Sequence, residues 1–388
     1  MSDWKAMSAL PGLNLRSPIE AGKAAIVPRD DPRLIGLCEE SKKLKSFLGR
    51  FTDAFGEKLE PAVIIVASDA PPTMMTREAI AGLRDAAALS MVIHNRSQAL
   101  RYGHMSRPSY SNSFALYPWF IDNVDQHLTI HTPGMLGTHY VRKFKGQCAP
   151  EVSVADVGEL DFDVPLLSEL MIRWASRFST KKPSYEHRVL FRSLNMANQA
   201  SLIPGGSDAT FYDYGRIVGL WISAFEILAH PQGADVGYKQ VYDMLKRAEW
   251  TSRKLVWRRW VAPEGKKKKK VRCSLPVWLC NHLYATRNDF FHGNEVSVKT
   301  LMIKNSKSSL FQVAAPIYRM LLTTFLDLQW RGQFPPITNV DGFAEAIVDR
   351  MSFTSGQKLA EDAILASVGK FPRGITSRRR AGHGPRCR

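Results

Sequence analysis

An arginine and a histidine stand five residues apart late in the chain, and an asparagine directly follows the arginine. These residues are Arg287, Asn288 and His292. Histidine exchanges a proton near neutral pH, and arginine holds a phosphate through a rigid fork of donors. Such groups can cleave RNA without a metal ion when the ribose 2′-hydroxyl attacks the adjacent phosphorus. The residue types therefore predict phosphate chemistry on RNA.

Spacing alone carries little weight, because Arg378 and His383 in the arginine-rich end of the chain repeat it. Context separates the two pairs. A predicted helix begins after Ser274, has a proline in its first turn and ends near Gly293, a residue type that favours the left-handed conformation after a helix. Its apolar face carries Leu275, Leu279, Leu283 and Phe290. His292 falls in the last turn, where the helix carbonyls favour a positive imidazolium.

A second predicted helix precedes this one. It begins after Ser207 and Asp208, both good capping residues, and runs to about Ala229, where Pro231 and Gly233 follow. Its apolar stripe consists of Tyr214, Ile217, Val218, Trp221, Phe225 and Leu228. Glu226 lies on the same helix.

The two helices together resemble the HEPN superfamily, specifically its ApeA-like group. Residues 283–293 are similar to that family's arginine–polar–histidine–glycine signature, and residues 216–228 are similar to its preceding core helix with a glutamate. The resemblance covers about residues 207–300, extends plausibly to 330 and leaves out the first 155.

The resemblance implies a helical bundle that forms a homodimer in which two Arg–His pairs face one cleft, and a metal-independent endoribonuclease activity. It implies that His292 acts as base or acid, that Arg287 neutralises the phosphorane oxygens, and that Asn288 orients the phosphate or the imidazole. Glu226 would anchor Arg287 or support the site from behind, and Arg216 would add phosphate affinity. No cofactor is implied.

A purely structural interpretation of the same residues is also open. Arg287 could form a helix-terminal salt bridge with Asp289 or Glu295, and His292 could be a plain capping residue.

The chain as a whole is predicted to be α+β, with a mixed α/β module followed by an all-α antiparallel helical bundle. Residues 62–66 predict a buried strand, a helix is expected from Thr76 to about Leu100, and residues 127–131 and 138–144 alternate like strands. Helices are then expected over residues 165–178, 186–197, 237–257 and 315–330, the last with Pro316 in its first turn. The expected divisions are 1–155 for a sensor or regulatory module, 160–335 for the HEPN-like bundle, and 336–388 for a short helix and a basic tail.

Two basic segments carry most of the net charge of +17. Residues 250–272 contain ten lysines and arginines against one glutamate, and the last eighteen residues contain six arginines and no acid. Such segments attract polyanions through counterion release. The lysine run is expected to be a loop that contacts RNA through Lys266, Lys267, Lys268, Lys269 and Lys270. A solvated loop and tail without a partner is the alternative.

Other classes of protein are disfavoured. The five cysteines are odd in number and lack a CxxC pair, no apolar run is long enough to span a membrane, and no secretory leader is expected, so we expect a cytoplasmic protein. His127 and His131 share a strand face without a carboxylate motif, so no metal site is expected. Trp257, Trp260 and Trp278 could stack bases but are more typical of a core.

These features predict a metal-independent endoribonuclease that acts in antiviral defence or as a toxin-like effector. Its expected partners are RNA, a second copy of the chain and a regulatory partner of the N-terminal module. The alternative is a non-catalytic RNA- or partner-binding helical module, or an oligomerisation scaffold.

Overall fold

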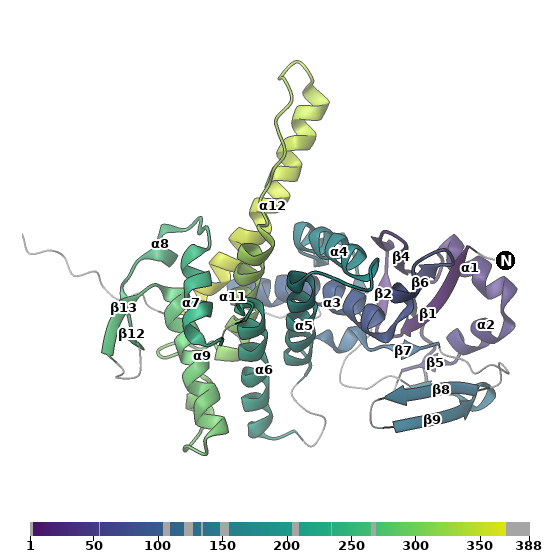
Figure 1. The fold of residues 1–388 in the computed structure, drawn as a ribbon, viewed down its shortest axis with the longest axis horizontal. Helices are drawn as coiled ribbons and strands as arrows, with labels where there is room; N and C mark the ends of the chain where they lie inside the picture. Colours follow the sequence, from purple (N-terminus) through teal and green to yellow (C-terminus); the bar gives the residue numbers. More distant parts are fainter. Residues whose placement is uncertain are drawn as a thin grey trace, which may run out of the picture.

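The computed structural model describes residues 3–53, 55–103, 109–119, 127–132, 135–147, 155–203, 209–233, 235–264 and 269–369. An antiparallel sheet near the N-terminus is followed by a large group of helices (Figure 1), so the predicted α+β class is confirmed.

The main sheet has five strands in the order β3-β4-β6-β1-β7, and every neighbouring pair is antiparallel. The strands are β1 (Trp4–Leu10), β3 (Ile19–Ala21), β4 (Ala24–Val27), β6 (Ala62–Ala67) and β7 (Tyr117–Pro118). β6 is buried along its whole length, as its apolar run predicts. Alternate residues of β6 belong to two different cores: Ile64 faces the helical body, and Ile65 packs with α1 (Pro32–Glu40) and α2 (Lys42–Leu48). The continuous apolar run thus reflects a sheet covered on both faces.

Short strands complete the N-terminal region. β2 (Leu13–Leu15) pairs in parallel with β11 (Ala155–Val157), and β5 (Phe51–Thr52) pairs in parallel with β10 (Gly146–Gln147). β8 (His127–Thr132) and β9 (Met135–Tyr140), both expected as strands, pair with each other in antiparallel orientation. The second strand ends earlier than predicted, because residues 141–143 form a short 3-10 helix. Other 3-10 helices lie at Pro72–Met75, Ser111–Phe114 and Glu159–Asp161.

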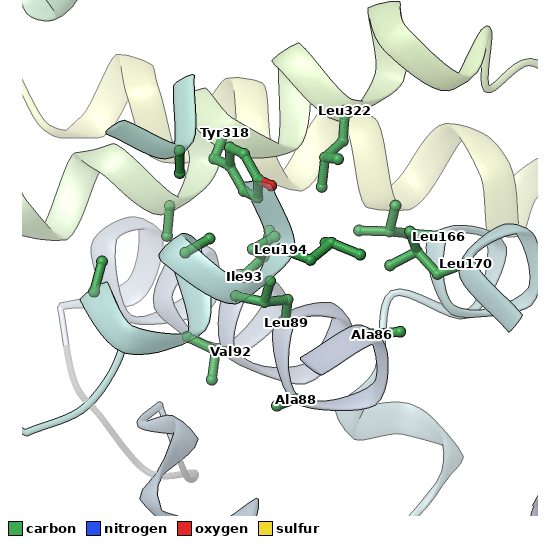
Figure 2. Packing of buried hydrophobic residues seen from close by; sticks show 14 of the residues in the cluster. Ala86, Ala88, Leu89, Val92, Ile93, Leu166, Leu170, Leu194, Tyr318 and Leu322 are labelled. Carbon is green, nitrogen blue, oxygen red and sulfur yellow. The ribbon is translucent and has the colours of Figure 1, made fainter. Parts of the chain in front are cut away.

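Helix α3 (Arg77–Tyr102) joins the sheet region to the bundle. The Thr76 side chain caps its first turn, as predicted, and left-handed Gly103 ends it. The helix is buried on most of its circumference because it packs against α4 (Val164–Phe178), α5 (Tyr185–Ala200), α11 (Leu310–Leu326) and α12 (Val340–Ala366). Figure 2 shows Leu89 and Ile93 of α3 among side chains such as Leu166 of α4, Leu194 of α5 and Tyr318 of α11.

The bundle helices follow the predicted order. They are α4 (Val164–Phe178), α5 (Tyr185–Ala200), α6 (Phe211–Ala229), α7 (Tyr238–Arg247), α8 (Arg253–Val256), α9 (Leu275–Phe291), α10 (Val298–Leu301), α11 (Leu310–Leu326) and α12 (Val340–Ala366). α6 packs against α5, α9 and α11, and its predicted apolar stripe is buried except for half-buried Tyr214. Thr210 is its N-cap, while Ser207 and Asp208 lie outside the described residues.

Four expectations were wrong in detail. The helix expected over residues 237–257 is two helices, α7 and α8, separated by an extended turn. Lys269 and Lys270 are not in a loop, because they lie in a strand, β13 (Lys269–Cys273), which pairs with β12 (Trp260–Glu264). Pro316 lies inside α11 because that helix begins five residues earlier than expected. The last helix, α12, is 27 residues long rather than short, and its first part extends away from the body in Figure 1.

One hydrophobic core crosses the predicted division near residue 155. It runs from side chains of β1 and β6 through α3 into α6, α9 and α11, and includes the end of α12. The N-terminal region and the bundle are therefore packed on a shared helix, α3.

Candidate functional site

The predicted arginine and histidine stand at the C-terminal end of α9. The helix ends at Phe291, His292 is its C-cap residue, and Gly293 adopts a left-handed conformation with φ of 73°. The predicted stop is thus confirmed, and it follows from glycine's freedom at positive φ. This end lies at the lower edge of the molecule in Figure 1, beside the start of α6.

Two glycines of α6 hold this end in place. A Cβ atom added to Gly219 would lie 2.7 Å from Cε2 of Phe291, and one added to Gly215 would overlap the ring of Phe290. The absence of side chains lets both rings press against the α6 backbone. This Gly-x3-Gly pattern was visible in the sequence, and the sequence reasoning missed its role.

Arg287 is half-buried, and no acidic group pairs with it among the described residues. Its Nη1 donates to Oδ1 of Asn288 at 3.1 Å, and its guanidinium lies 5.7 Å from the ring centre of Phe291. The alternative salt bridge to Asp289 is not formed, since the Asp289 carboxylate accepts from Nδ2 of Asn294 at 3.0 Å. The guanidinium therefore keeps most of its donors for another group.

His292 is exposed, and its backbone N–H donates to the Asn288 carbonyl oxygen at 2.9 Å. Its imidazole has no hydrogen-bond partner in the part of the chain that the structure describes. Backbone capping thus uses the main chain of His292 and leaves the ring open to a ligand.

Glu226 does not contact Arg287. Its Oε1 instead accepts a hydrogen bond from the Tyr284 hydroxyl at 3.1 Å, about one turn before Arg287 on α9. Burial raises the pKa of Tyr284, and Cys280 and Glu226 raise it further, which keeps the hydroxyl a neutral donor. Glu226 thus contacts α9 through Tyr284 and not through Arg287. This contact matches the supporting role considered for Glu226 rather than the anchoring of Arg287.

Arg216 follows Gly215 on α6, at the same end of the bundle as Phe290. Its side chain is 61% exposed, and Nη2 lies 3.6 Å from Oδ1 of Asp213. Hydrogen bonds from Thr210 lower the pKa of Asp213, which caps the helix as a carboxylate. The structure thus brings Arg216, Arg287 and His292 to one end of the α6–α9 pair.

The β12–β13 strand pair lies at the other end of α9 from His292. Trp260 of β12 packs on Trp278, with ring centres 4.4 Å apart, and Trp278 is in the first turn of the helix. At 1.5 Å per residue, about 20 Å of helix separates Trp278 from His292. Lys266, Lys267 and Lys268 lie outside the described residues, and Lys269 and Lys270 are in β13.

Two of the three tryptophans differ in exposure, which bears on whether each belongs to the core or is available to stack on a base. Trp278 is buried, which matches a core role. Trp257 is 38% exposed, and the guanidinium of Arg259 lies 4.0 Å from its ring centre.

No group of three or more His, Cys, Asp or Glu side chains is placed to hold a metal ion within the described ranges. The side chains of His127 and His131 fall outside the description.

The described helices include none that is both long and apolar enough to cross a lipid bilayer. Comparison of the chain with protein-family models, curated proteins and solved structures found no match.

Proposed function

We propose that the protein is a metal-independent endoribonuclease of HEPN type, with its site at the end of α9. One observation carries the proposal: among the described residues, Arg287 has no acidic partner and the His292 ring has no hydrogen-bond partner, and both residues stand where α9 stops. An arginine that no carboxylate engages keeps its charge and most of its donors available for an anionic ligand.

In the proposed reaction, His292 takes the proton of the ribose 2′-hydroxyl or gives one to the leaving 5′-oxygen. The 2′-oxygen forms a bond to phosphorus and the 5′-oxygen leaves, which gives a 2′,3′-cyclic phosphate and a 5′-hydroxyl. Arg287 stabilises the charge on the phosphorane oxygens. Asn288 holds the guanidinium through its side-chain oxygen, at the 3.1 Å contact. Arg216 adds attraction for the RNA backbone.

We further propose that two copies of the chain join at this end and bring two Arg–His pairs into one cleft. Large apolar side chains are exposed there: Tyr212 by 70%, Phe291 by 58% and Val298 by 67%. Burying such residues against a second copy would remove apolar surface from water. Sizing at micromolar concentration tests this, and a purely monomeric protein that still cleaves RNA would contradict it.

The cellular role belongs to the same proposal. The N-terminal module would receive a signal from a regulatory partner, and the nuclease would act in defence or as a toxin-like effector in the cytoplasm. The buried, free thiols of Cys38 and Cys280 support a reducing compartment.

A second candidate is a non-catalytic RNA-binding module. The β12–β13 strand pair favours it, because exposed Arg258, Lys270 and Arg272 lie on or beside it, at the end of α9 opposite His292. In that case RNA would bind this strand pair and the basic tail, and no RNA strand would be cut.

Incubating the purified protein with structured RNA in EDTA tests both candidates. The nuclease proposal predicts cleavage in EDTA, products with a 2′,3′-cyclic phosphate, loss of a cut when its nucleotide carries a 2′-deoxyribose, and loss of all cuts in Arg287→Ala. Arg378→Ala, at the arginine of the equally spaced tail pair, is the matched control and should cleave normally. Cleavage that stops in EDTA contradicts the metal-free mechanism. Binding without cleavage that weakens on removing residues 371–388 supports the second candidate.

A further inference from the structure

A cavity of about 580 Å³ lies between α3, α4 and α5, with one wall from α6. Its apolar part is formed by Gly82, Phe178, Phe191, Met196 and Ile227. The rings of Phe178 and Phe191 meet edge to face with centres 5.4 Å apart. A Cβ atom at Gly82 would lie 3.1 Å from one ring and 3.2 Å from the other, so the glycine lets both rings approach α3. The cavity thus has an aromatic floor suited to a flat apolar group.

Four arginines surround this floor, namely Arg77, Arg177, Arg188 and Arg192. Arg188 and Arg192 are exposed, and Arg177 is half-buried with its guanidinium 4.6 Å from the centre of the Phe178 ring. The Nε atom of Arg177 is buried and has no hydrogen-bond partner among the described residues. Burial lowers the pKa of Arg177; Glu78 opposes this effect, and Arg188 adds to it.

Among the described residues, no carboxylate forms an ion pair with Arg177, Arg188 or Arg192. Asp85 is already engaged, since its carboxylate accepts from Nε of Arg84 at 2.6 Å and from Nδ2 of Asn195 at 3.1 Å. Glu78 is the other acid among the described lining residues. The cavity therefore has excess positive charge beside an aromatic floor, and the amide oxygen of Asn195 remains as an acceptor for a polar ring substituent.

We propose that this cavity binds an aromatic phosphate monoester. The ring lies on the Phe178–Phe191 floor, and the arginines hold the phosphate through charge-assisted hydrogen bonds, including one from the unpartnered Nε of Arg177. The volume lies within the ordinary range for pockets that bind small organic molecules. Neither the ring alone nor the phosphate alone uses both halves of the cavity.

Calorimetric titration of the full-length protein tests the proposal. The probes are adenosine 5′-monophosphate and 1-naphthyl phosphate, compared with adenosine, 1-naphthol and inorganic phosphate. At least one ester should bind with a dissociation constant below about 1 mM, and its dephosphorylated form and inorganic phosphate should bind at least tenfold more weakly. Binding only of the nucleotide identifies a nucleotide site that uses Asn195, and binding of both esters identifies a general aromatic phosphate site.

Two exposed arginines supply variants that should fold normally. Arg188→Gln and Arg192→Gln should each weaken binding about tenfold, and Met196→Trp should abolish it by filling the floor. Arg253→Gln makes the same charge change at an exposed position outside the cavity and should bind normally. Arg287→Ala should also bind normally, which separates this cavity from the proposed nuclease site.

The proposal is overturned if neither ester binds even at about 10 mM, because the expected dissociation constant is below about 1 mM. It is also overturned if inorganic phosphate binds as tightly as the esters, or if Arg188→Gln and Arg192→Gln leave the affinity unchanged. A short RNA that binds more tightly than either ester, and loses that advantage in Arg192→Gln, would place an RNA end in the cavity and contradict the small-molecule assignment.

Discussion

Two arginines of the helical bundle stand in opposite surroundings. Arg319 of α11 is buried, and its Nε donates to Oδ2 of Asp163 at 2.8 Å, while Asp163 also caps α4. Arg287 at the end of α9 is half-buried, and within the described part of the chain its guanidinium contacts the side-chain oxygen of Asn288 and the ring of Phe291 and forms no ion pair. Arg319 thus joins α11 to the start of α4 through a carboxylate, whereas no carboxylate among the described residues pairs with Arg287 at the end of α9. This difference supports the proposal that the guanidinium of Arg287 serves a ligand rather than the fold.

The largest effect should come from breaking the buried pair. Asp163→Ala leaves the Arg319 charge buried without a partner and removes a helix cap, so the free energy of unfolding should fall by about 3–5 kcal/mol. Urea denaturation measures this. Arg16→Ala breaks an exposed pair with Asp156 and should leave the midpoint unchanged. Equal losses in the two variants would show that burial does not distinguish these pairs.

The next effect concerns the glycines that position the end of α9. Gly215→Ala drives a methyl group into the half-buried ring of Phe290 and should lower the free energy of unfolding by about 1–3 kcal/mol, with weaker RNA cleavage. Gly36→Ala is the matched control, because its helical site has no atom within 4 Å and the change should stabilise by about 0.5–1 kcal/mol. Parallel thermal melts compare the two, and a stabilised Gly215→Ala protein would contradict the close packing.

A smaller effect on stability is expected at the hydrogen bond between Tyr284 of α9 and Glu226 of α6. Tyr284→Phe removes the donor that contacts Glu226, and the free energy of unfolding should fall by about 1 kcal/mol. Cleavage should persist, because Glu226 acts on α9 rather than on Arg287. A complete loss of cleavage with an unchanged melting temperature would assign Glu226 a direct part in the reaction.

The smallest effect on stability should come from Arg287 itself. Arg287→Gln breaks no ion pair in the described structure, so the free energy of unfolding should change by less than about 0.5 kcal/mol. A loss as large as that of Asp163→Ala, measured in the same urea series, would make Arg287 a structural residue and remove the contrast with Arg319.

The ends of several helices could be predicted from the sequence, whereas packing between segments far apart in the chain could not. The end of α9 was predictable because Gly293 follows an apolar helix, and the start of α3 because Thr76 caps it. Tertiary packing decided the rest. Helix α11 extends before Pro316 because Leu310 and Val313 are buried in the core, which outweighs the hydrogen bond lost at the proline.

The site shows the same limit. Arg287, Asn288 and His292 could be chosen from a short segment, whereas the partner of Glu226 depends on how α6 and α9 pack. The β12–β13 strand pair lies at the end of α9 opposite His292 because of the Trp260–Trp278 contact, and no hydrophobic periodicity in the sequence reveals that contact. The arginine cavity gathers residues from α3, α4 and α5 and has no signature in any one segment.

The central claim is that His292 is a catalytic group, and the rate of RNA cleavage in EDTA tests it most directly. Wild type, His292→Ala and the tail variant His383→Ala should have the same melting temperature. The account predicts that His292→Ala slows single-turnover cleavage by about 10²–10⁴-fold and that His383→Ala cleaves like wild type. Equal cleavage rates in His292→Ala and wild type would contradict it.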